Sequence, residues 1–302
     1  MALFSHCLMP NLKYIKKVLY LFLYFPIFLV DYLISLFSDH HTSLFLSYNY
    51  MRLIYSLTRG ASNVFLALPY KLIYRAVGVY SPFSDEIKEF GFTKIEPTLI
   101  SKELAHKIKF RCNSLPLYEA KKNIKDRKEF SCFGDIQNKI NFTVPRLKYY
   151  DSDIASIKEV WELIDVLKLN KIAASYLGCD PIITTLSSWY VVPLIQDDKS
   201  DELYDYTAQS YHYDMDWISF LKVFINLDKV DDSNGAFEYI PCTHRGRSSE
   251  YYRDVRFKDL DRHSNPEYAF GDVGSIFLAD TSGLHRDGRA ISSCRQVLMI
   301  EF

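Results

Sequence analysis

The segment 211–217 carries the side chains in this chain that are best suited to bind a metal ion. Its sequence is YHYDMDW. In an extended strand, residues two apart point to the same face, so His212 and Asp214 would present an imidazole and a carboxylate side by side. An octahedral iron(II) site with open positions uses two histidines and one carboxylate. The pair therefore predicts two ligands of such a site, and a third ligand must come from elsewhere in the chain.

Three histidines follow the pair, namely His244, His263 and His285. His285 lies in the segment 271–295, GDVGSIFLADTSGLHRDGRAISSCR, which reads as a turn, a buried strand, a loop with the histidine and an arginine that opens the last strand. His244 follows a strand end and is expected near the surface or beside the ligands. We favour His285 as the third ligand and keep His244 as the alternative.

The elements that must position these side chains change in kind along the chain. Apolar residues recur at helical spacing between residues 153 and 176, which predicts a helix, and Ser101 marks the start of another. The segment DDSNG at 231–235 predicts a hairpin turn. Helices followed by short strands predict an α+β fold whose strands close a sandwich or barrel. The strands are expected at 182–192, 219–227, 236–240, 274–278 and 296–302.

The order of motifs is more specific than any one of them. HYD is followed by NGAFEYIPCTHR, GDV, DTSGLHR and, ten positions beyond His285, by Arg295. From about residue 84 to the C-terminus, this series resembles the phytanoyl-CoA dioxygenase-like family of iron(II)- and 2-oxoglutarate-dependent oxygenases. The resemblance implies a double-stranded β-helix, or jelly roll, with flanking helices. It also implies that His212, Asp214 and His285 are the catalytic residues and the metal ligands.

The same resemblance implies the reaction and its cofactors. These are Fe(II), O2 and 2-oxoglutarate as the cosubstrate, with Arg295 binding the distal carboxylate of 2-oxoglutarate. A guanidinium suits that role because it makes two parallel hydrogen bonds to a carboxylate. Arg286 and Arg289 compete for it. The expected reaction hydroxylates a C–H bond of a small-molecule or lipid-like substrate and releases succinate and CO2. Asp214 argues against the halogenating branch, which lacks this carboxylate.

Two alternative functions also fit these motifs. The first is a non-catalytic jelly-roll module that binds a metal or ligand. The second is a zinc hydrolase with the same ligands, which would leave Arg295 without a role. Cys242 departs from the family pattern, since family members commonly have glycine there. The strand at 182–192 is expected to line the pocket, with Ser188, Trp189 and Tyr190 as candidate contacts, and the face that points inward is left open.

The first 80 residues differ from the rest. They are dense in Leu, Phe and Tyr, and the run 18–37 is long enough to cross a hydrocarbon core of ~30 Å. Pro26 would kink such a helix, and Asp31 would cost up to about 3 kcal/mol at the bilayer centre. We expect residues 1–80 to form a hydrophobic helical extension, associated with a membrane or packed on a protein, and residues 81–302 to form the oxygenase domain.

The charge balance and the cysteines limit the kinds of partner and compartment that we expect for this protein. Lys and Arg total 36 against 37 Asp and Glu, so no basic field attracts nucleic acid. Six scattered cysteines without a C-x-x-C pair argue against a disulfide scaffold. The need for iron(II) and 2-oxoglutarate favours the cytoplasm, peripheral to or anchored in a membrane. A sequon at Asn141 keeps a lumenal location as the alternative. The oligomeric state is left open.

Overall fold

The computed structural model of this 302-residue chain describes residues 75–76, 78–121, 127–135, 142–194, 203–204, 207–214, 219–245 and 265–302. The hydrophobic extension expected over residues 1–80 lies outside the described residues, apart from its last few. His263 and Asn141 lie outside them as well. Within the described part of the chain, no helix has both the length and the apolar composition needed to cross a bilayer.

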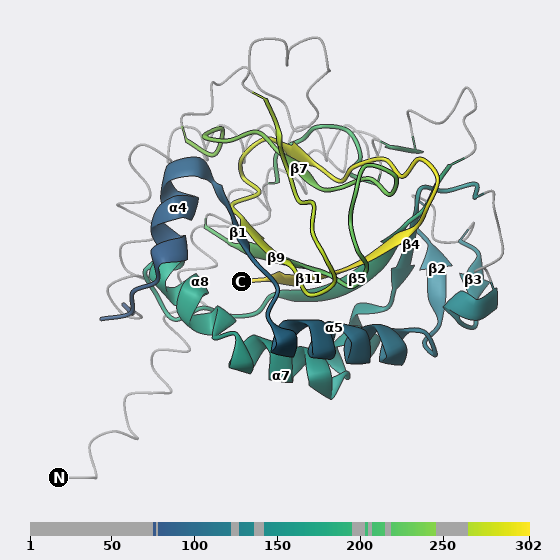
Figure 1. The fold of residues 1–302 in the computed structure, drawn as a ribbon, viewed down its shortest axis with the longest axis horizontal. Coiled ribbons are helices and arrows are strands. Elements are labelled where there is room, and N and C mark those ends of the chain that lie inside the picture. Colours follow the sequence, from purple (N-terminus) through teal and green to yellow (C-terminus); the bar gives the residue numbers. More distant parts are fainter. Residues whose placement is uncertain are drawn as a thin grey trace, which may run out of the picture. The chain divides into compact units, whose positions relative to one another are not determined.

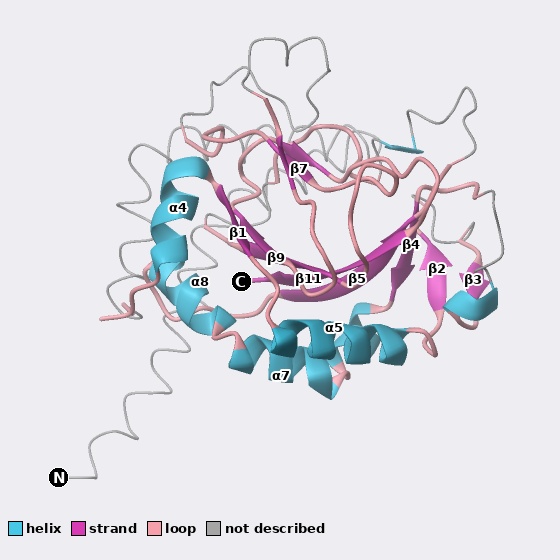
Figure 2. Ribbon diagram, viewed as in Figure 1, coloured by secondary structure: helices cyan, strands magenta, loops and turns pink. Residues whose placement is uncertain are grey.

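Helices precede most of the strands and lie along one side of the main sheet (Figures 1 and 2). They are α4 (Pro82–Phe90), α5 (Leu99–Cys112), the 3-10 turn η2 (Phe133–Asp135), α6 (Asp151–Ala155), α7 (Lys158–Val166) and α8 (Leu169–Leu177). Gly91 ends α4 with a left-handed φ of 81°. Thr98 caps α5 and forms a reciprocal capping box with Ser101, so this helix starts earlier than the serine alone indicates.

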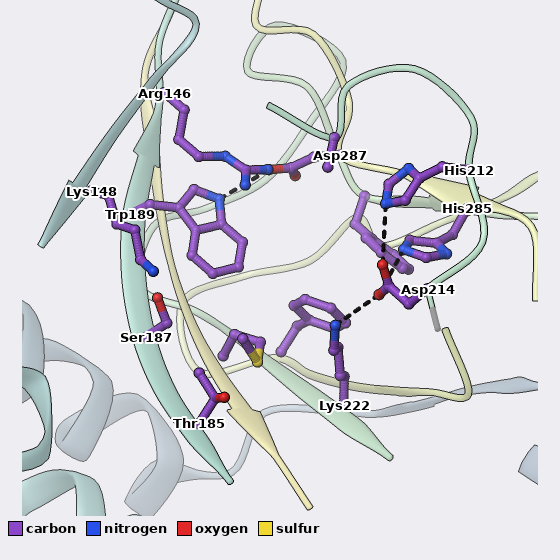
Figure 3. Close-up of a pocket in the computed structure, with 14 residues that line it drawn as sticks. Arg146, Lys148, Thr185, Ser187, Trp189, His212, Asp214, Lys222, His285 and Asp287 are labelled. Carbon is purple, nitrogen blue, oxygen red and sulfur yellow. Dashed lines mark hydrogen bonds and ion pairs between the residues drawn. The ribbon is translucent and has the colours of Figure 1, made fainter. Parts of the chain in front are cut away.

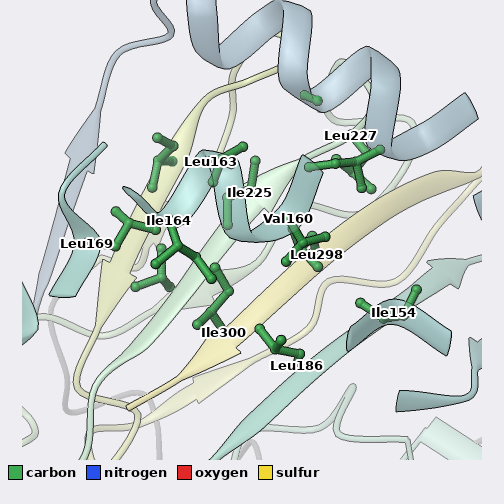
Figure 4. Packing of buried hydrophobic residues seen from close by; sticks show 14 of the residues in the cluster. Ile154, Val160, Leu163, Ile164, Leu169, Leu186, Ile225, Leu227, Leu298 and Ile300 are labelled. Atoms are coloured by element: carbon green, nitrogen blue, oxygen red, sulfur yellow. The ribbon is translucent and has the colours of Figure 1, made fainter. Parts of the chain in front are cut away.

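The single helix expected over residues 153–176 is divided into three. Lys168 lies between α7 and α8 with φ 53° and ψ 38°, a left-handed conformation that interrupts a continuous helix. The apolar face itself is buried as the spacing predicts, and it packs on the main sheet (Figure 4). The buried residues of this face include Ile154, Val160, Leu163, Ile164 and Leu169.

The strands form two sheets. They are β1 (Phe92–Ile95), β2 (Leu117–Glu119), β3 (Glu129–Phe130), β4 (Arg146–Tyr149), β5 (Thr185–Val191), β6 (Lys222–Asn226), β7 (Glu238–Tyr239), β8 (Glu267–Tyr268), β9 (Ile276–Ala279), β10 (His285–Arg286) and β11 (Arg295–Glu301). The described strands of the large antiparallel sheet run in the order β1-β9-β6-β11-β5-β4-β2-β3, and those of the small sheet in the order β10-β7-β8.

From β5 onward the chain passes back and forth between the two sheets. β5, β6, β9 and β11 lie in the large sheet, whereas β7, β8 and β10 form the small one. His212 joins the small sheet through an isolated bridge to His285. This arrangement is consistent with the jelly roll that the sequence predicts. It also overturns one expectation: the turn at 231–235 connects β6 to β7, which lie in different sheets, so no hairpin forms there.

The large sheet separates two apolar layers because its side chains alternate in direction. On the helix side, Leu186 and Tyr190 of β5 join the main core. On the opposite side, Trp189 and Val191 join a second cluster with residues of the small sheet. Residues of β11 directly opposite β5 face the same way, so this second layer defines the interior in which polar side chains meet.

Candidate metal centre and adjoining cavity

Backbone hydrogen bonds join the segment that carries His212 and Asp214 to the segment that carries His285. The amide of His212 donates to the carbonyl of His285 at 2.9 Å, and the reverse bond measures 3.1 Å. Asp214 is held two residues further on by a 2.9 Å bond from its amide to the carbonyl of Thr281. Since the paired segments lie side by side, residues far apart in sequence present their side chains to one point.

The three side chains converge there, as Figure 3 shows. Each offers one ligand atom, and these atoms lie within 4.8 Å of one another. Oδ1 of Asp214 lies 3.4 Å from Nε2 of His212, and Oδ2 lies 3.4 Å from Nε2 of His285. The two rings are buried and their centroids are 4.3 Å apart. The spacing leaves room for one ion between the three atoms.

Backbone carbonyls orient both imidazoles. Nδ1 of His212 lies 2.9 Å from the carbonyl oxygen of Ser210, and Nδ1 of His285 lies 2.9 Å from that of Gly283. A carbonyl only accepts hydrogen bonds, so each Nδ1 carries the proton. In the neutral ring, Nε2 then offers a lone pair. Burial lowers the pKa of His285, and the neighbouring His212 lowers it further, which favours that neutral form.

Asp214 is kept ionised by its surroundings. Burial alone would raise its pKa, but the positive charges of His285 in its protonated form and of Lys222 outweigh burial and hold the pKa well below its usual value. Nζ of Lys222 donates to Oδ2 of Asp214 at 2.7 Å and also lies 3.3 Å from Oε2 of Glu301. One buried ammonium thus serves two carboxylates.

This arrangement fits a divalent cation. A carboxylate and two Nε2 lone pairs face one another, and once both Nδ1 atoms are bonded to carbonyls, a donor that the described residues offer to this group is Nζ of Lys222 at Oδ2 of Asp214. Three ligand atoms with lone pairs repel one another at this distance unless a cation lies between them. Two imidazoles and one carboxylate on one side of the ion, with the other positions open, match the facial site of non-haem iron(II). Anchoring each ligating imidazole through its other ring nitrogen is typical of metal sites.

His244 is placed elsewhere. Its ring is buried, and Nε2 lies 3.1 Å from the carbonyl oxygen of Lys88 in α4. It is not part of the group around Asp214. Nearby, Cys242 adopts a φ of 66°. That left-handed conformation favours glycine, which is the residue expected there from the resemblance.

A cavity of about 190 Å³ adjoins the three ligands. Thr185, Ser187 and Trp189 of β5 form one wall, opposite the ligands (Figure 3). Ser188 and Tyr190, which were expected to contact the pocket, lie on the other face of β5, since side chains alternate along a strand. The further lining residues are Arg146, Lys148, Ala208, Lys222, Phe224, Phe237, Asp287 and Met299.

Arg295 lies at the end of this interior, and its guanidinium is hydrogen-bonded to other groups of the protein. It is 2% exposed, its Nε donates to the carbonyl of Gly235 at 2.6 Å, and its Nη2 is paired with Oδ1 of Asp287. Oδ2 of Asp287 accepts from Nη2 of Arg146 at 2.7 Å and from Nε1 of Trp189 at 2.9 Å. Among the described residues, those that line the cavity include Arg146 and Asp287 but not Arg295.

The competing arginines lie outside this interior. Arg286 follows His285 in β10 and therefore points to the opposite face, where its Nη2 donates to Oε1 of Glu238 at 2.8 Å. The guanidinium of Arg289 lies 4.0 Å from the ring centroid of Tyr204. Neither lines the cavity beside the ligands within the described part of the chain.

Sequence reasoning did not single out four charged residues of the cavity: Arg146, Lys148, Lys222 and Asp287. Lys222 and Asp287 lie within segments that were interpreted as a strand and a loop, and the segment around Arg146 and Lys148 was not assigned. One signal was available, since Lys222 interrupts the apolar strand 219–227 and a cation inside such a run needs a buried partner. The sequence carries no such signal for Arg146.

No family model matches the chain, and no curated protein matches it significantly. Its resemblance to the phytanoyl-CoA dioxygenase-like family therefore stays a prediction. Solved structures do match. SnoK, described as a non-heme alpha-ketoglutarate-dependent carbocyclase from nogalamycin biosynthesis, is 13% identical with a TM-score of 0.47, and the match covers 75% of this chain and 85% of SnoK.

Two further structures contain 2-oxoglutarate. EvdO2 from Micromonospora carbonacea var. aurantiaca is 15% identical with a TM-score of 0.47, over 76% of this chain and 92% of EvdO2. EctD from S. alaskensis, solved with 2-oxoglutarate and 5-hydroxyectoine, is 13% identical with a TM-score of 0.49, over 76% and 77%. At such identities and scores the similarity assigns no reaction to this chain, and its own side chains must carry the assignment.

Proposed function

We propose that residues 81–302 form an iron(II)- and 2-oxoglutarate-dependent dioxygenase that hydroxylates a C–H bond of a small molecule and releases succinate and CO2. The observation that carries the proposal is the convergence of His212, Asp214 and His285, with both imidazoles anchored through Nδ1. Two histidines and one carboxylate with open positions are the ligand set of the non-haem iron oxygenases.

The cavity charges support a dianionic cosubstrate. Arg146, Lys148 and Lys222 contribute three positive charges, and Asp214 and Asp287 contribute two negative charges. Their ion-pair partners Arg295, Asp151 and Glu301 bring the group into balance. A bound divalent metal ion would therefore leave a positive excess, which a small dicarboxylate such as 2-oxoglutarate would offset.

The residues of this chain have separable tasks in such a reaction. When bound, iron(II) with 2-oxoglutarate and O2 supplies the oxidising chemistry that couples decarboxylation of the keto acid to hydroxylation of the substrate. The carbonyls of Ser210 and Gly283 hold the imidazoles in the ligating orientation. Lys222 keeps Asp214 ionised. The apolar side chains beside them exclude water from the reacting position. They are Phe224, Phe237 and Met299.

Cavity size favours a small substrate over an enclosed lipid. Pockets that enclose drug-sized ligands measure roughly 300–1,000 Å³. The cavity here is about 190 Å³ and must also receive the cosubstrate. A lipid would therefore insert only one end, whereas a small molecule could lie mostly inside. Supply of iron(II) and 2-oxoglutarate places the protein in the cytoplasm under this proposal, with residues 1–80 as the segment that would attach it to a membrane.

Substrate-stimulated succinate release tests the proposal. Full-length protein is incubated with iron(II), 2-oxoglutarate and a panel of small molecules, and succinate is measured for each. We expect at least one compound to raise succinate formation, with incorporation of one oxygen atom from O2 into that compound. The His285→Ala variant is the matched control and should remain at background. Tight binding of iron(II) and 2-oxoglutarate without turnover on any compound would favour the non-catalytic binding module instead.

A further inference from the structure

Two arginines and one carboxylate lie together on one face of the large sheet, beside the far end of the cavity. Val191 of β5 is paired with Arg146 of β4 on one side and with Arg295 of β11 on the other. Directly opposite residues in adjacent strands point to the same face, and two strand spacings of about 4.8 Å separate the two arginine backbones. Asp287 lies between their guanidinium groups and bonds to both.

Of the two arginines, Arg295 is already occupied. Its Nε and Nη2 are bonded to Gly235 and Asp287, and it is almost fully buried. A ligand that took these donors would leave a carbonyl and a buried carboxylate without partners, and a buried group left unpaired carries its full desolvation cost. Arg295 therefore neutralises Asp287 and does not reach the cavity.

Arg146 differs on each of these points. It lines the cavity, and its Nε is buried without a hydrogen-bond acceptor among the described residues. Its guanidinium lies over the ring of Trp189, 4.7 Å from the centroid, and the same indole donates to Asp287. The stacking and the shared carboxylate fix the plane of the guanidinium before any ligand binds. An arginine that is fixed in this way and retains free donors is suited to bind a planar carboxylate.

The charges agree with this assignment. Arg146 and Arg295 carry two positive charges and Asp287 carries one negative charge, so this end of the cavity has an excess of one positive charge. One carboxylate of a ligand would balance it. Lys148 is the nearest rival on the same wall, but its Nζ lies 3.2 Å from Asp151, and 29% of its side chain is exposed. Solvent screens such a charge.

We propose that Arg146, and not Arg295, binds the distal carboxylate of 2-oxoglutarate in this protein, while Asp287 compensates Arg295. The inference rests on the proposed function and can fail separately from it. A ligand with a methyl group in place of the distal carboxylate isolates the contact. 2-Oxovalerate is that ligand, since it has the same chain length and the same keto acid end.

The experiment measures the binding of both keto acids to full-length protein loaded with Mn(II), by titration calorimetry. The wild type should prefer 2-oxoglutarate. Arg146→Gln should reduce that preference by about 10- to 100-fold through weaker 2-oxoglutarate binding alone, because one charge-assisted contact is lost. Binding of 2-oxovalerate and Mn(II) should not change. Arg146→Lys should keep part of the preference, and Arg289→Gln, whose guanidinium lies outside the cavity lining among the described residues, is the matched control that keeps all of it.

Each other outcome has a definite meaning. An Arg146→Gln protein that still prefers 2-oxoglutarate as strongly as the wild type overturns the assignment, and so does a Lys148→Gln variant that loses as much of the preference as Arg146→Gln. If Arg146→Gln does not fold, Arg146→Lys decides, since an unchanged preference there would contradict a two-pronged guanidinium contact. A wild-type protein that binds Mn(II) but neither keto acid would refute the inference together with the proposed cosubstrate.

Discussion

Replacing Lys222 by methionine should weaken the fold and tighten metal binding at the same time. Lys222 is the cation between two carboxylates, 2.7 Å from Asp214 and 3.3 Å from Glu301. All three side chains are buried or nearly so. Removing one partner from a buried ion pair costs about 3–5 kcal/mol, because the other charge is left without compensation. Methionine preserves most of the apolar stem, so the loss of charge dominates.

The loss of unfolding free energy can be divided between Asp214 and Glu301, the two carboxylates that Lys222 compensates. Glu301 keeps a 2.7 Å hydrogen bond from Thr184, so we take the lower end and expect the metal-free protein to lose about 3 kcal/mol of unfolding free energy. A bound metal ion compensates Asp214 but not Glu301. If half of the cost belongs to Asp214, the metal-bound protein loses only about half, and metal affinity rises by about tenfold, since 1.4 kcal/mol corresponds to that factor.

Urea unfolding with a chelator measures the first quantity, and calorimetric titration with Mn(II) measures the second. The melting temperature of the metal-free variant should fall by about 6–12 °C for a domain of this size. Adding Glu301→Gln to the Lys222→Met variant should restore about half of the lost stability of the metal-free protein without altering metal affinity. A variant that binds Mn(II) more weakly than the wild type would refute the reasoning, because it would mean that Lys222 orients Asp214 more than it competes with the metal.

Three further predictions follow from the same contacts. His285→Ala should weaken Mn(II) binding by more than about 100-fold in calorimetry, since even partners of ligands are worth 10- to 100-fold, whereas His244→Ala should leave it unchanged; the reverse result would make His244 the third ligand. Gly288→Ala places a Cβ 2.1 Å from a backbone carbonyl oxygen and should cost at least about 1–3 kcal/mol in urea unfolding, while Gly134→Ala, with its nearest atom at 3.5 Å, should cost little. A chain that begins at residue 81 should keep Mn(II) binding and lose the membrane association that flotation of the full-length chain detects; a full-length chain that never floats would count against the membrane role of residues 1–80.

Local periodicity made part of the site predictable. His212 and Asp214 are two residues apart, and in an extended segment that spacing alone brings their side chains to one face. The strands β5, β6, β7, β9 and β11 were placed to within a few residues, because β-branched and aromatic runs between turns reflect local preferences, whereas the two-residue strands β8 and β10 were not predicted. The helical region 153–176 was recognised by its apolar spacing, although Lys168 divides it.

Features that depend on pairing between distant segments could not be predicted from local periodicity. The turn at 231–235 has the composition of a hairpin, yet β6 and β7 enter different sheets, since the interior is closed only when both layers are present. The face of β5 that lines the cavity was likewise undetermined. A shift of one residue would exchange Trp189 for Tyr190, and only packing of the whole core selects between the two registers.

The sequence by itself determined the chemistry that is available here: an imidazole and a carboxylate on one strand, further histidines downstream and an arginine at the start of the last strand. The tertiary structure decided which of these groups meet. It brings His285 to the metal group and leaves His244 against α4. It also joins Arg295 to Asp287 and places Arg146 in the cavity. Strand register is a property of the whole core, because each pairing is stabilised by side chains from other segments, and no local pattern contains that information.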